Sequence, residues 1–136
     1  MLSLRLPQRV FLCTLPTDMR RSFDGLAGMV RAHLGGDPLS GDLFVFRSKR
    51  GDRVKLLYFE PGGFCIWYQR LEEGTFKFPA NAQAPGLRNA QAVGEHGLEI
   101  HADDLALLLD GIDLASIRRG KRYRRPAAAT SSAVTS

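Results

Sequence analysis

The chain has 136 residues, of which 44% are hydrophobic and 24% charged, and its net charge is +5. This length is enough for one domain with its own core, and the composition excludes a chain that is disordered throughout. The basic excess lies in residues 118–125, which hold six of the 19 lysines and arginines and no acidic residue. Outside this run the chain has 13 basic and 14 acidic residues, so the positive charge belongs to one segment.

The two cysteines, Cys13 and Cys65, lie far apart within apolar runs. Two such cysteines make no disulfide framework, and a small buried thiol is a common core residue. No run of about 18 apolar residues occurs, and the amino terminus lacks the pattern of a signal peptide. We therefore expect reduced thiols, no membrane span and a cytoplasmic location.

The first expected elements are a strand and a helix. Residues 9–15 are short, apolar and bounded by prolines, which is typical of a strand. Thr17 is a predicted N-cap, and Asp18 follows it where the helix dipole favours a negative charge. A helical apolar stripe then predicts one long amphipathic helix that ends at Gly35–Gly36. The stripe consists of Met19, Phe23, Leu26, Val30 and Leu34.

Four strands are expected next, at residues 43–47, 53–59, 64–70 and 75–78. Residues 48–52 have the length and composition of a hairpin loop between the first two of these strands. A short helix is expected from about residue 102 to 110. Together the patterns predict an α+β fold: an antiparallel meander of about four to five strands, one long amphipathic helix packed on a face, and a short C-terminal helix.

The domain organisation follows from changes in composition. Residues 1–79 form the predicted α+β core, and residues 80–97, rich in Ala, Asn, Gln, Gly and Pro, form a predicted flexible connector. Residues 98–117 are expected to return to the core as a strand and a short helix. Residues 118–136 contain the basic run and an Ala/Ser/Thr tail that we expect to be disordered.

No catalytic, cofactor or metal site is predicted. The histidines His33, His96 and His101 are scattered without metal-ligand spacing, and no strand leads into a glycine-rich phosphate loop. Aspartates are more numerous and are expected to act as cap and turn residues. They are Asp18, Asp24, Asp37, Asp42 and Asp52. A small metal-dependent nuclease that uses these carboxylates remains an alternative.

Basic residues give the strongest functional signal, and they form two groups. The hairpin contributes Arg47, Lys49, Arg50, Arg53 and Lys55, and the tail contributes Arg118, Arg119, Lys121, Arg122, Arg124 and Arg125 around Tyr123. Such density predicts salt-sensitive, sequence-independent DNA binding, with Tyr123 available to stack on a base. A solvated loop tip explains the hairpin charges equally well, whereas the tail charges favour nucleic acid or an acidic partner.

Nine aromatic residues of the predicted sheet fall on both faces of the strands. They are Phe44, Phe46, Tyr58, Phe59, Phe64, Trp67, Tyr68, Phe76 and Phe78. A base-stacking platform is one interpretation, but a core face and a partner-binding face explain the distribution better. An exposed sheet face would also allow a second copy of the chain to bind.

Three blocks with a fixed order and spacing resemble a known family. They are Thr17-Asp18-Met19-Arg20, Asp24-Gly25-Leu26-Ala27 and the run from Asp37-Pro38 through Ser40-Gly41 to Leu43-Phe44-Val45-Phe46-Arg47. Further matches are Lys55, Gly63-Phe64, Arg70-Leu71-Glu72, Gly74, Phe76 and Pro79, and residues 105–113 resemble the family's last helix. The stretch from residue 10 to 79 resembles the TnpB-type, Orf2-like accessory protein of insertion-sequence-66-type transposable elements. This family is distinct from the RNA-guided nucleases of the same label.

The resemblance implies a role in transposition beside a separate transposase, which would supply the catalysis. We therefore expect a non-enzymatic accessory factor that contacts DNA, the transposase, or both. An alternative is a protein-interaction module whose basic run binds an acidic partner surface. If DNA is the partner, deletion of residues 118–136 is expected to remove most of the affinity.

Overall fold

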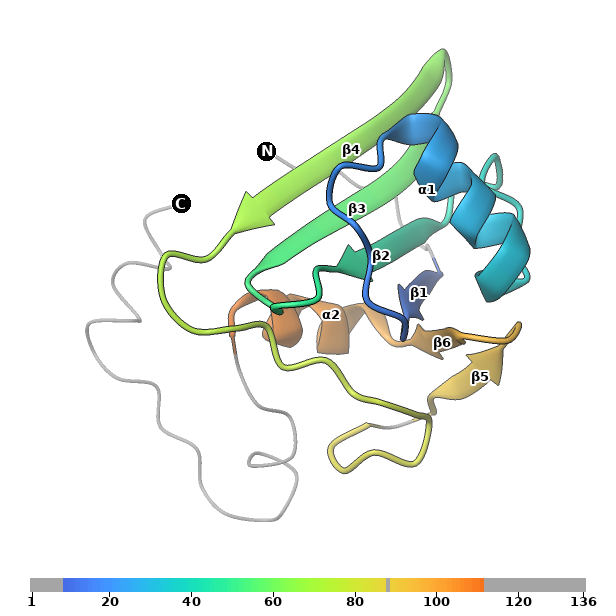
Figure 1. Ribbon diagram of the computed structural model, residues 1–136. Helices are drawn as coiled ribbons and strands as arrows, with labels where there is room; N and C mark the ends of the chain where they lie inside the picture. Colours follow the sequence, from blue (N-terminus) through green and yellow to red (C-terminus); the bar gives the residue numbers. More distant parts are fainter. Residues whose placement is uncertain (1–8, 88, 112–136) are drawn as a thin grey trace.

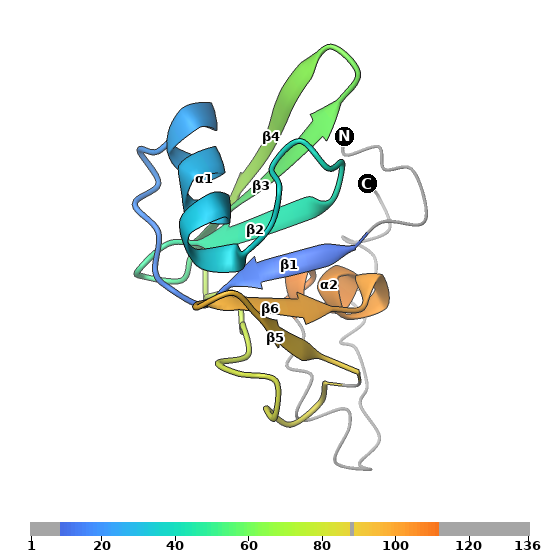
Figure 2. The ribbon, with the colours of Figure 1, turned by 90° about the vertical axis from the view of Figure 1, so that its right-hand side faces the viewer.

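The computed structural model describes residues 9–87 and 89–111. Among these residues, one six-stranded mixed sheet forms the centre of the molecule, in the order β4-β3-β2-β1-β6-β5, and a helix lies on each of its faces (Figures 1 and 2). The elements are β1 (Val10–Cys13), α1 (Phe23–Met29), the π-helix η1 (Val30–Leu34), β2 (Leu43–Arg47), β3 (Arg53–Glu60), β4 (Gly63–Arg70), β5 (Gln91–Val93), β6 (Gly97–Ile100) and α2 (Ala102–Leu109).

The α+β class is confirmed, but the predicted simple meander is wrong. Strand β1 pairs in parallel with β2, while all other neighbouring strands of the described sheet are antiparallel. The parallel pair arises because α1 and η1 connect β1 to β2, and two adjacent strands joined by a helical crossover run in the same direction. The sheet also gains β6 beside β1, so β1 and β2 lie at its centre.

The first helical segment is shorter than predicted. It comprises the 7 residues of α1 and the 5 residues of η1, and its N-cap is Ser22 rather than Thr17. The chain forms a turn before Ser22, because the Asp18 carboxylate accepts the backbone N–H of Arg20 at 2.9 Å and the Asp18 carbonyl accepts that of Arg21 at 3.0 Å. An aspartate bonded in this way favours a turn over a helix. The predicted end is confirmed at Gly35, which has a φ of 64°.

Residues 75–78 form no strand, contrary to the prediction. The alternation places Phe76 in the core, where it is fully buried, and leaves Lys77 exposed. Residues 71–87 cross the face of the sheet that carries α2 instead of extending the sheet beyond β4. Strand β5, in contrast, lies within the segment 80–97 that was expected to be a flexible connector, and it pairs with β6.

Each face of the sheet has its own core. On one face Leu26, Val30 and Leu34 pack against strand residues such as Phe44 and Phe46. On the other face Leu105 and Leu108 of α2, with Phe76, pack against the remaining buried strand residues. The second face is therefore covered by α2 and residues 71–87. This leaves less apolar sheet surface exposed for the partner that was expected to bind there.

Cys13 belongs to the first of these cores and is 2% exposed, and burial raises the pKa of its thiol. It therefore acts as a protonated apolar side chain, as expected for a small core residue. Cys65 lies on β4 and is half-buried, and both cysteines are free. No helix within residues 9–87 and 89–111 is long and apolar enough to cross a membrane.

Candidate nucleic-acid interface

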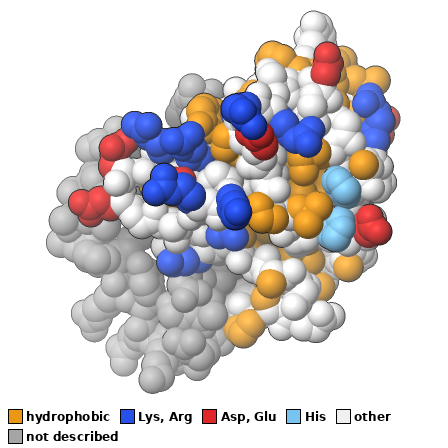
Figure 3. Space-filling model, viewed as in Figure 1, with side chains coloured by type: hydrophobic (Ala, Val, Ile, Leu, Met, Phe, Trp, Pro, Cys, Tyr) orange, Lys and Arg blue, Asp and Glu red, His pale blue; other side chains and the backbone are white. Residues whose placement is uncertain are grey.

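A groove of about 620 Å³ lies between the turn at residues 17–20 and the β2–β3 hairpin. Its lining is Thr17, Asp18, Met19, Arg20, Ser48, Lys49, Arg50, Asp52, Arg53 and Tyr68. The lining includes four basic side chains from two segments that are distant in the sequence. Lysine and arginine side chains gather on this part of the surface (Figure 3).

Backbone hydrogen bonds fix the turn on one side of the groove. The Thr17 N–H donates to the carbonyl of Arg47, the last residue of β2, at 2.9 Å, and Thr17 is only 3% exposed. Arg20 donates to the Asp18 carboxylate at 2.7 Å through Nη2, and this contact holds the pKa of Asp18 well below its usual range. Asp18 therefore stays ionised and orients Arg20, whose side chain is 91% exposed.

The hairpin loop on the other side is ordered around Ser48. The Ser48 Oγ accepts the backbone N–H groups of Gly51 at 3.2 Å and of Arg53 at 3.1 Å. Gly51 has a φ of 84°, a conformation that favours glycine. This internal bonding leaves Lys49 and Arg50 exposed at the tip. The loop therefore holds these two cations in a defined place.

Lys55 and Tyr68 connect the two sides of the groove. The Lys55 Nζ donates to the Arg21 carbonyl at 2.8 Å and lies 5.0 Å from the centre of the Tyr68 ring. Lys55 and Tyr68 are register partners on β3 and β4, so their side chains share a face of the sheet. Tyr68 is 49% exposed, whereas Phe64 and Ile66 on the same face of β4 pack against the core that includes α1. The aromatic ring is thus presented to solvent beside the basic side chains.

Arg47 is not among the residues that line the groove. Its Nη1 donates to the Phe76 carbonyl at 2.9 Å, and its guanidinium lies 5.4 Å from the centre of the Phe78 ring. The structure therefore brings together Lys49, Arg50 and Arg53 and gives Arg47 a place in the packing of residues 71–87. The predicted tail residues lie outside the described part of the chain. They are Arg118, Arg119, Lys121, Arg122, Tyr123, Arg124 and Arg125.

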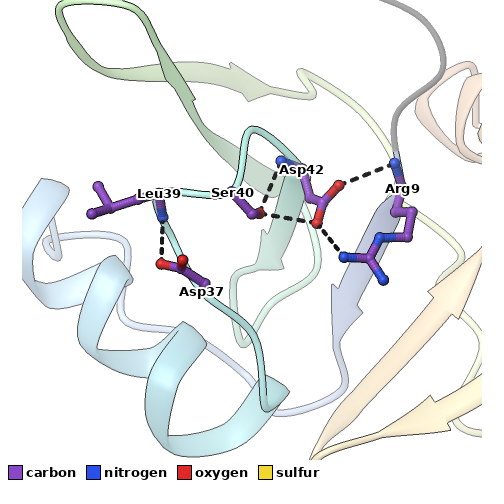
Figure 4. Close-up of polar contacts among 5 residues, drawn as sticks. All are labelled: Arg9, Asp37, Leu39, Ser40 and Asp42. Atoms are coloured by element: carbon purple, nitrogen blue, oxygen red, sulfur yellow. Dashed lines mark hydrogen bonds and ion pairs between the residues drawn. The ribbon is translucent and has the colours of Figure 1, made fainter.

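The turn of the third block is built from aspartates that bond within the chain (Figure 4). Asp37 Oδ1 accepts the Leu39 N–H at 2.9 Å. Asp42 accepts the Ser40 hydroxyl at 2.9 Å and the Arg9 guanidinium at 3.0 Å. Asp37 therefore stabilises the turn itself, and Asp42 joins the start of β2 to the residue before β1.

The five aspartates considered for a nuclease do not assemble into a metal site. Within residues 9–87 and 89–111, none of them belongs to a group of three or more side chains with ligand atoms close enough to share an ion. A two-metal or one-metal nuclease requires such a group of carboxylates. The described residues thus give no geometric support to the nuclease alternative.

Comparison with known proteins assigns the chain to a family. The family model described as IS66 Orf2 like protein matches residues 8–119. This chain belongs to the IS66 Orf2-like family. Two relatives are uncharacterized proteins of Sinorhizobium fredii (strain NBRC 101917 / NGR234). One, y4jC, is 34% identical over 118 residues, which cover 87% of this chain and 90% of the relative. The other, y4hO, is 37% identical over 106 residues, which cover 77% and 81%. No solved structure matches the chain.

Family membership confirms the resemblance seen in the spaced blocks and associates this IS66 Orf2-like chain with transposition. The structure shows what the blocks do: the first forms one wall of the groove, the second places Leu26 and Ala27 in a core, and the third forms the turn into β2. Arg20 and Tyr68 were not predicted as members of the candidate interface. Alternation along β4 places Tyr68 on the same face as Phe64 and Ile66. The sequence does not show that the core beneath α1 ends before Tyr68, which leaves its ring exposed.

Proposed function

We propose that this IS66 Orf2-like protein is a non-catalytic accessory factor that binds DNA in the groove and helps the transposase of its element to assemble on DNA. The observation that carries the proposal is the convergence of Arg20, Lys49, Arg50 and Arg53 around an exposed tyrosine. The family supplies the context of transposition, and the groove supplies the chemistry for a polyanion.

The charge and rigidity of the groove favour phosphate contacts. The lining has four basic and two acidic side chains, so its net charge is positive. One of the two acidic side chains, Asp18, is paired with Arg20. Both loops are held by backbone hydrogen bonds, which lowers the entropy cost of placing the cations on a phosphate backbone. Tyr68 can stack on an unpaired base without selecting a sequence. The expected binding is therefore salt-dependent and largely independent of sequence.

Arg50→Glu is expected to weaken binding to a short DNA duplex by roughly tenfold at low salt, because a phosphate contact becomes a repulsion. The slope of log K against log salt should fall by about 1. Electrophoretic mobility shift or fluorescence anisotropy, titrated from about 50 to 200 mM salt, measures both quantities.

The matched control is Arg31→Glu, which makes the same charge change at an exposed arginine of η1 that does not line the groove. This variant should lose only the small affinity that follows from net charge. Equal losses in both variants would argue against the groove, and a wild-type protein that binds no DNA at low salt would exclude DNA binding altogether.

Deletion of residues 118–136 from the wild-type chain is expected to remove most of its DNA affinity. The slope of log K against log salt should fall by about 5, if all six basic residues of the run contact phosphates. The matched control deletes only residues 126–136, which keeps the basic run and should bind as the full chain does. If both truncations bind DNA equally well, the basic run has another partner. Co-purification with the transposase after nuclease treatment would then favour an acidic protein surface.

A further inference from the structure

Two histidines that are far apart in the sequence meet at the edge of the first core. The rings of His33 and His96 have their centres 5.3 Å apart at an interplanar angle of 60°. Glu95 completes the group, and one ligand-type atom from each of the three side chains lies within 4.8 Å of the others. Figure 3 shows histidine side chains at the surface beside an acidic side chain.

The backbone around this cluster is fixed on both sides. The His96 N–H donates to the His33 carbonyl at 2.8 Å, and the His96 carbonyl accepts the Thr14 N–H at 2.8 Å and its hydroxyl at 3.0 Å. His33 itself lies on η1, and π-helical turns are frequent at functional sites. The end of η1 and the β5–β6 turn are therefore held against each other before any ligand binds.

Glycines make this close approach of two backbones feasible. A Cβ on Gly94 would lie 2.6 Å from the His33 carbonyl oxygen, and one on Gly35 would lie 3.2 Å from the Gly94 Cα. Gly94 also has a φ of 60°. The chain thus uses residues without side chains where His33, Glu95 and His96 are brought together.

The cluster contains a buried polar atom that has no hydrogen-bond partner among the described residues. His33 Nδ1 is buried and has no hydrogen-bond partner within the described residues. A buried ring nitrogen without a partner is costly, and bonding to a metal ion is one way to satisfy an imidazole. Glu95 Oε1 and His96 Nε2 are 3.8 Å apart on the more exposed side of the cluster.

We infer that His33, Glu95 and His96 bind one divalent transition-metal ion, with Zn²⁺ as the best match. Two histidines and one glutamate form a known zinc donor set, and water fills the fourth position. Two imidazoles on one tetrahedral zinc have their ring centres about 5 Å apart, which agrees with the observed pair. Zinc-bound ligand atoms lie about 3.3 Å from one another, so small side-chain rotations complete the site. The ion would clamp the end of η1 to the β5–β6 turn.

The test is isothermal titration of Zn²⁺ into the untagged full chain, together with thermal unfolding with and without the metal. We expect one equivalent to bind and the Tm to rise. His33→Gln and His96→Gln should each weaken binding by at least about 100-fold. Removal of a residue that only hydrogen-bonds to a metal ligand costs about 10–100-fold in affinity, and removal of the ligand itself costs more. Glu95→Gln should weaken Zn²⁺ binding by at least about tenfold. Because the Glu95 side chain is 73% exposed, this substitution should not disturb folding, and a loss of affinity would reflect the loss of a ligand.

His101→Gln is the matched control, because His101 caps α2 by accepting the Asp103 N–H and lies outside the cluster. It should bind Zn²⁺ as the wild-type protein does. The inference is overturned if the wild-type chain binds no Zn²⁺, or if Glu95→Gln and His96→Gln bind it with unchanged affinity. Unchanged affinity in these variants would mean that the histidine pair is only an aromatic packing contact.

Discussion

Phe76→Ala is expected to destabilise the protein by about 3–5 kcal/mol, measured as the free energy of unfolding in urea. Phe76 is fully buried although it belongs to no helix or strand. Its ring centre lies 6.4 Å from that of Phe78, and its backbone N–H donates to the Gly51 carbonyl at 2.8 Å. Removal of the ring leaves a cavity in the core beneath residues 71–87. Folded domains have free energies of unfolding of about 5–15 kcal/mol, so this single change is expected to remove a large fraction of the stability.

Lys77→Ala is the matched control, since Lys77 is the next residue and its side chain is exposed. A surface change of this kind is expected to alter the free energy of unfolding by no more than about 0.5 kcal/mol. A loss below about 1 kcal/mol for Phe76→Ala would show that residues 71–87 are not packed on the sheet. The outcome also bears on the groove, because Gly51 belongs to the hairpin that carries Lys49 and Arg50.

The strands and helices that have a strong local pattern could be predicted from the sequence. Apolar runs identified β1 to β4 and β6, and Gly35 identified the end of the first helical segment, because these signals depend only on neighbouring residues. The order of the strands could not be predicted in the same way. It depends on which apolar faces meet, and the parallel pairing of β1 with β2 follows from the helical crossover between them. Strand β5 has three residues and an exposed pattern, so it has no apolar signal of its own.

Local polar bonding explains the wrong start of the first helix. Thr17 and Asp18 have the chemistry of helix caps, but Thr17 bonds to the end of β2 and Asp18 bonds to Arg20. The same two residue types favour turns and caps alike, so only the distant partner, Arg47, decides between them. Phe76 shows a similar limit, since alternation correctly identified a buried residue and wrongly assigned it to a strand.

The candidate site was predicted in part. Charge density along the chain indicated Lys49, Arg50 and Arg53, and the structure places all three in one groove. Arg20 lies beside these three residues because the backbone of Thr17 bonds to the end of β2. Arg47 is the last residue of β2, and its side chain lies on the face of the sheet that carries α2, where it bonds to Phe76. The histidine cluster could not be predicted from the sequence. Metal-binding motifs are recognised by short spacings between the ligands, whereas His33 and His96 are far apart in the chain and come together only in the folded protein.

Gly94→Ala is the second large effect, with an expected loss of roughly 3 kcal/mol or more in the free energy of unfolding. Two costs add up: alanine at a φ of 60° costs about 1–2 kcal/mol, and its Cβ, 2.6 Å from the His33 carbonyl oxygen and from the Leu34 carbonyl carbon, forces backbone apart. Both neighbouring atoms belong to the backbone of η1, so no side-chain rotation relieves the contact. The hydrogen bond from His96 to His33 should break, and the two histidines should separate.

Gly74→Ala separates the two costs, because Gly74 has a φ of 79° but lies in open space, where an added Cβ would meet no atom of the described residues within 4 Å. It should lose only about 1–2 kcal/mol from backbone strain. Thermal unfolding should therefore show a clearly larger fall in Tm for Gly94→Ala than for Gly74→Ala. Zn²⁺ should raise the Tm of Gly74→Ala and leave that of Gly94→Ala nearly unchanged, because only the second substitution pushes η1 away from the β5–β6 turn. Equal losses in the two variants would mean that the close backbone contact at Gly94 contributes nothing to holding the metal ligands together.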